Sequence, residues 1–99
     1  MPKDEDVDNR LLRIEGRVQG VGYREACVQR AQALGLTGYV RNRRDGSVEA
    51  MLQGPIEAVS RMQAWLHKGP PLAQVDRVVA IALPLPPIQL ERFACWPTA

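Results

Sequence analysis

The residues best suited to chemistry in this chain lie at positions 16–24, which read Gly-Arg-Val-Gln-Gly-Val-Gly-Tyr-Arg. Three glycines within seven positions favour a loop, because glycine costs backbone entropy inside a strand or a helix. A strand-like stretch precedes the loop and a helical pattern follows it. Backbone amides at the start of a helix form a site for an anion, and the guanidinium of Arg24 adds donors suited to a phosphate-like group. The alternative is an ordinary glycine-rich turn between a strand and a helix.

Two other phosphate-binding motifs are excluded by the residues of this loop. A P-loop ends in Gly-Lys followed by Ser or Thr, and that combination does not occur in the chain. A dinucleotide-binding fingerprint that began at Gly20 would require a third glycine where Glu25 stands. The loop is therefore not assigned to either nucleotide-binding class.

Asn42 is the second candidate, at the end of a predicted strand and before a hairpin turn at Asp45-Gly46. Its amide offers both a donor and an acceptor, so it can orient a water molecule that attacks a bound phosphoryl group. The alternative is that Asn42 only ends the strand, because asparagine is common in turns.

Composition predicts one globular domain with an anionic partner. The chain has 99 residues, of which 45% are apolar, and a formal net charge of +2. Residues 1–9 hold one lysine and four acidic residues, so they carry −3 and the remainder carries +5. A basic body favours an anionic ligand, but a nucleic-acid surface would be more basic and richer in exposed aromatic residues.

Cys27 and Cys95 are the two cysteines, and they form no metal-binding motif, so no metal is expected. Cys27 is interpreted as a small buried hydrophobe. Both cysteines stand at positions that can face the core, so a reduced pair and a disulfide both remain open. The chain has no apolar run long enough to cross a membrane, and its acidic N-terminus lacks a signal-peptide core. We therefore expect a cytoplasmic protein.

The elements that must position these residues follow a simple order. Residues 1–9 are expected to be a disordered tail, and residues 10–99 a single domain. Strands are predicted at 10–15, 37–42, 47–53 and 74–83, with a marginal one at 90–96. Helices are predicted at 23–34 and between Gly54-Pro55 and Gly69-Pro70-Pro71. This β-α-β-β-α-β order predicts a ferredoxin-like α+β fold, with a mixed, mainly antiparallel sheet and two helices on one face.

Apolar residues at helical spacing mark the buried face of each helix. In the first helix these are Tyr23, Cys27, Ala31 and Leu34, and in the second Ile56, Val59, Met62 and Leu66. Gly35 is predicted to end the first helix as a left-handed cap. His67 is assigned to the negative end of the second helix and not to catalysis. Three prolines predict an extended loop: Pro84, Pro86 and Pro87.

Taken together, these stretches resemble the acylphosphatase family from about residue 11 to residue 79. Residues 16–24 are similar to the phosphate-binding loop of that family, and residues 34–42 with 45–49 are similar to its second signature. The resemblance implies hydrolysis of small acyl phosphates to a carboxylate and inorganic phosphate, without a metal or an organic cofactor. It implies catalysis by Arg24 and Asn42, with the asparagine positioning the attacking water. It implies a phosphate cradle formed by Gln19, Gly20, Val21, Gly22, Tyr23 and Arg24.

Partners follow from the same resemblance. We expect a monomer that binds an acyl phosphate, with inorganic phosphate or sulfate able to occupy the loop, and without a nucleic-acid or membrane partner. Two alternatives stay open. One is a non-catalytic module that binds a phosphorylated ligand or a nucleic-acid backbone. The other is an accessory domain that works with carbamoyl phosphate inside a larger assembly.

Four features depart from the family pattern. Tyr23 stands where Phe is commoner and Tyr39 where Trp is commoner, and both keep the aromatic body. Arg43 follows the asparagine, where it would either strengthen substrate attraction or slow phosphate release. Residues 92–99 lack the usual ending, which leaves open whether the C-terminal part of the chain contacts Arg24.

Overall fold

The computed structural model describes residues 7–83 and 89–99. Its strands are β1 (Val7–Arg17), β2 (Thr37–Asn42), β3 (Val48–Pro55), β4 (Gln74–Ile81) and β5 (Phe93–Cys95). Its helices are α1 (Tyr23–Ala33) and α2 (Ile56–Lys68). The order β-α-β-β-α-β with a short further strand is the predicted ferredoxin-like α+β fold.

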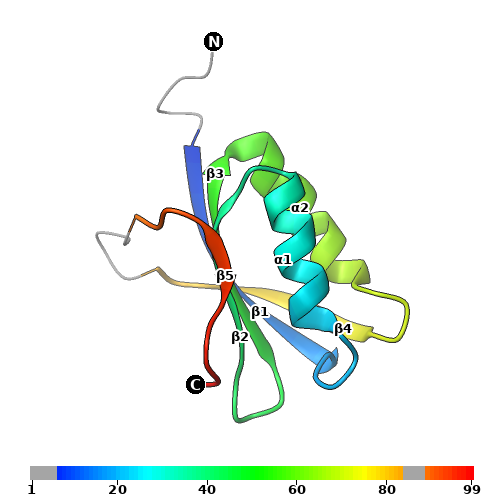
Figure 1. Ribbon diagram of the computed structural model, residues 1–99. Helices are drawn as coiled ribbons and strands as arrows, with labels where there is room; N and C mark the ends of the chain where they lie inside the picture. Colours follow the sequence, from blue (N-terminus) through cyan, green and yellow to red (C-terminus); the bar gives the residue numbers. More distant parts are fainter. Residues whose placement is uncertain (1–6, 84–88) are drawn as a thin grey trace.

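The strands form one sheet in the order β4-β1-β3-β2-β5. β1 pairs antiparallel with β3 and β4, β2 pairs antiparallel with β3, and β5 lies parallel to β2. Both helices cover the same face of this mixed sheet (Figure 1). Because β1 and β2 are both antiparallel to β3, they run in the same direction and end at the same edge of the sheet. The loop after β1, which leads into α1, and the end of β2 therefore lie at this edge.

The core lies between the sheet and the two helices. Inward-facing strand residues such as Leu12, Ile14 and Val40 are almost fully buried there. The helices contribute Tyr23, Cys27, Ala31, Val59, Met62 and Leu66, which confirms most of both predicted stripes. Ile56 is an exception at 47% exposure, because it opens α2 beside the exposed Pro55, where β3 has left the core.

The start of the domain differs from the prediction. β1 begins at Val7, which pairs with Pro55 of β3, so the tail predicted for residues 1–9 is wrong at residues 7–9. Pairing with β3 orders this polar stretch, and an ion pair of 2.8 Å between Asp8 and Arg10 adds a local contact. Residues 1–6 lie outside the described part of the chain, as does the loop predicted from the three prolines.

Other element ends shift by a few residues. Gly35 has the predicted left-handed conformation, with φ of 73°, and the N–H of Leu36 donates to the carbonyl of Ala31 at 2.9 Å. Pro55 is the last residue of β3 and the N-cap of α2, and so precedes the first helical turn. β5 covers only three residues of the predicted fifth strand.

Candidate active site

The loop between β1 and α1 consists of residues 18–22. Gly20 and Gly22 have φ of 74° and 78°, a left-handed conformation that favours glycine, and Gly22 is the N-cap of α1. The hydrogen bonds of the described residues include none donated by the backbone N–H groups of residues 20–24. These donors at a helix N-terminus are therefore available to an anionic ligand.

A cleft of about 500 Å³ opens at this loop. It is lined by Val18, Gly20, Gly22, Tyr23, Arg24, Glu25, Asn42 and Cys95. The two residues expected to be catalytic, Arg24 and Asn42, thus share one cleft although they come from α1 and β2. Two of the residues expected in the phosphate cradle, Gln19 and Val21, do not line it.

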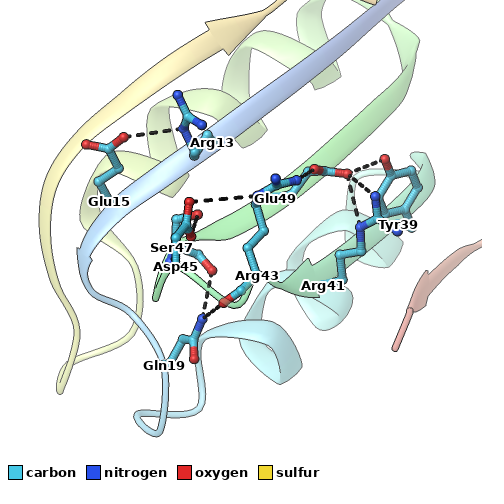
Figure 2. Close-up of polar contacts among 9 residues, drawn as sticks. All are labelled: Arg13, Glu15, Gln19, Tyr39, Arg41, Arg43, Asp45, Ser47 and Glu49. Carbon is cyan, nitrogen blue, oxygen red and sulfur yellow. Dashed lines mark hydrogen bonds and ion pairs between the residues drawn. The ribbon is translucent and has the colours of Figure 1, made fainter. Parts of the chain in front are cut away.

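Gln19 instead fixes the loop to the hairpin between β2 and β3. Its side-chain Nε2 donates to the carbonyl oxygens of Arg43 and Ser47, at 2.8 Å each (Figure 2). Because this hairpin directly follows Asn42, the two bonds connect both halves of the cleft. The glutamine side chain thus joins the loop to the hairpin, a contact that the sequence pattern did not indicate.

Arg24 is half-buried at the start of α1 and contacts the C-terminal part of the chain. Its Nη1 lies 3.8 Å from the Sγ of Cys95 in β5. The contact left open by the sequence is thus made through a thiol. Cys27 and Cys95 are both free, so the disulfide that the sequence left open is not formed, and Cys27 is buried whereas Cys95 is exposed. By strand alternation Cys95 shares a face with the buried Phe93, but it lies at the open cleft and is exposed.

Asn42 has a fixed main chain and an unused side-chain acceptor. Its backbone pairs with Val48 in β3, and its carbonyl accepts a bond of 3.0 Å from the N–H of Ala99. Its Oδ1 is buried and has no hydrogen-bond partner among the described residues. An unsatisfied buried acceptor costs about 1–3 kcal/mol, which is typical of a group that a ligand or a water satisfies.

Both unusual tyrosines use their hydroxyl groups. Tyr23 donates to the carbonyl of Leu66 at 2.6 Å, which ties the start of α1 to the end of α2. Burial raises the pKa of Tyr23, so this hydroxyl stays protonated. Tyr39 donates to Oε2 of Glu49 at 2.6 Å, and burial together with this carboxylate raises the pKa of Tyr39 to about 12. A phenylalanine at position 23 would have no donor for the first contact, and a tryptophan at position 39 would have no hydroxyl for the second.

Glu49 lies at the centre of an ion-pair cluster with two arginines of the β2 strand and hairpin (Figure 2). Its carboxylate is 2.6 Å from Nη1 of Arg43 and 3.0 Å from Nη2 of Arg41. Strand alternation places Arg41 on the face of β2 opposite to Asn42. Arg43 is not among the residues that line the cleft, and its guanidinium is paired with Glu49.

We expect Glu49→Gln to lower the free energy of unfolding by about 2–4 kcal/mol near neutral pH, because both arginines would lose a buried charge partner. Burial alone would raise the pKa of Glu49, but the hydrogen bonds from Tyr39 and Arg43 and the charge of Arg41 outweigh it and lower the pKa from its usual value. Such a group stabilises the fold above its unfolded pKa, and that stability is lost as the pH falls through the folded pKa.

Denaturant unfolding at neutral and acidic pH checks this prediction. The wild type should lose more stability on acidification than Glu49→Gln does, and the exposed Glu57→Gln should behave like the wild type. If the wild type and Glu49→Gln lost the same stability on acidification, the ionised carboxylate of Glu49 would not stabilise the fold as proposed.

His67 is exposed in the last turn of α2 and does not line the cleft. Within residues 7–83 and 89–99, no three or more His, Cys, Asp or Glu side chains are grouped so that they could hold a metal ion. No helix in the same ranges is long and apolar enough to span a membrane.

Comparison with known proteins gives the family. A family profile described as Acylphosphatase matches residues 11–95. The chain belongs to the acylphosphatase family. It is 56% identical over 89 residues to Acylphosphatase 1 of Ralstonia nicotianae, a match that covers 90% of this chain and 87% of the relative. It is 51% identical over 96 residues to the acylphosphatase of an Azoarcus species, a match that covers 96% of this chain and 95% of the relative.

Solved structures agree with this assignment. The structure of an acylphosphatase from Coxiella burnetii superposes with a TM-score of 0.84 at 30% sequence identity, covering 95% of this chain and 97% of that one. The family, the fold and the enzyme class expected from the sequence are therefore confirmed. As a member of the acylphosphatase family, the chain is a hydrolase with a small-molecule acyl phosphate as substrate.

Two residues of the cleft lie outside the loop and the asparagine expected from the sequence: Glu25 and Cys95. Val18 lies within the expected loop but was not among the residues assigned to the phosphate cradle. Glu25 could have been found, because it follows Arg24 in the first turn of a helix that opens on the loop. Cys95 could not, because no local signal in residues 93–95 indicates that this strand joins the edge of β2.

Proposed function

We propose that this cleft hydrolyses acyl phosphates by attack of water on phosphorus. The meeting of three groups in one cleft carries the proposal: the guanidinium of Arg24, the unbonded loop amides and the free acceptor of Asn42. The amides and Arg24 hold the phosphoryl oxygens and stabilise the charge that builds up in the transition state. Asn42 holds the attacking water.

The chemical step needs little more than this positioning. Oδ1 of Asn42 accepts a hydrogen bond from the water and directs its oxygen at phosphorus, in line with the bond to the acyl oxygen. A phosphorus–oxygen bond forms, and the bond to the acyl oxygen breaks with its electron pair. The carboxylate product is a good leaving group, so no nucleophilic side chain is required.

The proton of the water goes to a phosphate oxygen of the substrate in this proposal. Glu15 is 2.6 Å from Nε of Arg77, and neither Glu15 nor His67 lines the cleft. Neither residue is therefore placed to act as a general base. Glu25 does line the cleft, so it is included in the test. Glu15→Gln, Glu25→Gln and His67→Ala should all retain turnover, and loss of turnover in any of them would contradict this proton path.

Hydrolysis of benzoyl phosphate by the purified chain tests the proposed function. We expect turnover without added metal and the same rate in EDTA. A rate that collapses in EDTA would contradict the metal-free mechanism. Binding of inorganic phosphate without turnover would instead support the non-catalytic binding module.

The oligomeric state, the cellular location and the absence of a nucleic-acid partner are part of the same proposal. We propose that the enzyme acts as a monomer in the cytoplasm and without a nucleic-acid partner. Light scattering after size exclusion should then give a mass near 11.0 kDa. A dimer mass, or a shift on addition of nucleic acid, would contradict this part.

We also predict that kcat/KM falls as ionic strength rises, because the positive net charge of the chain attracts an anionic substrate. The screening length shrinks from about 30 Å at 0.01 M salt to about 8 Å at 0.15 M, so a drop of several-fold is expected across this range. Initial rates at low substrate concentration measure the effect, with sucrose as a control for viscosity. A kcat/KM that does not change with ionic strength would show that the net charge of the protein does not attract the substrate.

A further inference from the structure

Glu25 is the acidic residue in the lining of the cleft. It follows Arg24 in the first turn of α1, its side chain is exposed, and it lines the cleft together with Arg24. Within the described residues it makes no ion pair and no hydrogen bond, whereas Glu15 and Glu49 are held by arginines. Its negative charge is therefore not neutralised by a neighbouring side chain.

The rest of the lining offers the acyl group of a substrate little else to recognise. Arg24 is the cationic residue of the lining, and the proposed function assigns it to the phosphoryl group. The ring of Tyr23 is buried and its hydroxyl is bonded to Leu66, so it presents no aromatic surface to a ligand. Apart from Arg24 and Glu25, the residues that line the cleft carry no formal charge.

We propose that Glu25 selects substrates by the charge of their acyl group. An acyl phosphate with a second carboxylate would place like charges in the same cleft, which costs free energy when neither is neutralised. Neutral acyl groups avoid this repulsion, and acyl groups that carry an ammonium gain attraction. The inference rests on the proposed function, because it concerns the acyl side of the same cleft. Its structural alternative is that Glu25 only stabilises the N-terminus of α1.

Two substrates of nearly equal shape test this inference: para-carboxybenzoyl phosphate and para-carbamoylbenzoyl phosphate. At low salt the wild type should favour the carbamoyl compound by about 3- to 10-fold in kcat/KM. Glu25→Gln should bring this ratio close to one while keeping the rate on benzoyl phosphate. The matched control is Glu57→Gln, because Glu57 is the exposed acidic residue in the first turn of α2. This substitution changes the net charge by the same amount as Glu25→Gln.

The wild type provides a second measurement that needs no variant. Its preference should fall towards one near 1 M salt, where the screening length is about 3 Å. An unchanged preference in Glu25→Gln, with benzoyl phosphate still hydrolysed, would overturn the inference and leave the proposed function intact. Loss of benzoyl phosphate turnover in Glu25→Gln would also overturn it, because Glu25 would then be a general base. If the wild type hydrolysed none of the three compounds, the proposed function would fail first.

Discussion

Arg24→Gln is expected to lower kcat/KM for benzoyl phosphate by about 100- to 1000-fold, which is the usual effect of removing one preorganised donor from a transition-state site. The neutral amide keeps some hydrogen-bonding capacity but loses the positive charge and the two-pronged geometry of guanidinium. The loop amides remain, so residual activity should persist. The inhibition constant of inorganic phosphate should rise together with the loss of rate, because Arg24 holds the phosphoryl group in both the substrate and the product.

Arg30→Gln is the matched control for this variant. Arg30 is exposed and lies in the last turn of the same helix, away from the cleft. The Arg30→Gln substitution changes the net charge by the same amount as Arg24→Gln, but it should leave kcat/KM within about two-fold of the wild type at moderate salt. Similar losses in both variants would mean that the general charge of the protein, and not the position of Arg24, is responsible.

Asn42→Ala is expected to lower kcat by about 100-fold, because the attacking water would lose the group that holds it in line. Binding of inorganic phosphate should be almost unchanged, since the loop amides and Arg24 remain in place. A loss in kcat without a loss in phosphate binding separates a water-positioning role from a role in the phosphate cradle. The buried, unpartnered Oδ1 of Asn42 is the observation behind this prediction.

The other asparagine of the chain, Asn9, provides the control. It lies in β1, where it pairs with Gln53, and it does not line the cleft. Asn9→Ala should keep the wild-type kcat. If Asn42→Ala also kept the wild-type kcat, or lost phosphate binding to the same extent as turnover, the assigned role would be wrong.

Much of the fold could be predicted because the local signals agreed with one another. Helical spacing, the Gly35 cap, the turn at Asp45-Gly46 and the apolar strands all indicated the same order of elements. The ends were less predictable, because pairing across the sheet fixes them. Val7 is ordered by β3, and Ile56 is exposed because the sheet ends beside it.

The candidate site divides in the same way. The loop glycines, Arg24 and Asn42 carry a pattern that can be read along the chain, and the structure brings these residues together. The contacts of Gln19 and Cys95 could not be read in this way, because each joins segments far apart in sequence. Such contacts depend on the register of the strands, which the sequence alone does not specify.

The two tyrosines show how a conservative change can carry a new contact. Treating Tyr23 and Tyr39 as substitutes that only preserve an aromatic ring omitted their hydroxyl groups. One hydroxyl joins α1 to α2, and the other completes the environment of Glu49. A buried hydroxyl needs a partner, so the presence of tyrosine at core positions is itself a signal that an acceptor lies nearby.

The most direct test of the account is hydrolysis of benzoyl phosphate in water enriched in heavy oxygen. Phosphorus NMR and mass spectrometry then show which product carries the label, and incubation of the enzyme with unlabelled phosphate controls for later exchange. Attack of a water held by Asn42 on a phosphoryl group held by Arg24 and the loop predicts the label in inorganic phosphate and none in benzoate. Label in the benzoate would show attack at the carbonyl carbon and would contradict the proposed mechanism.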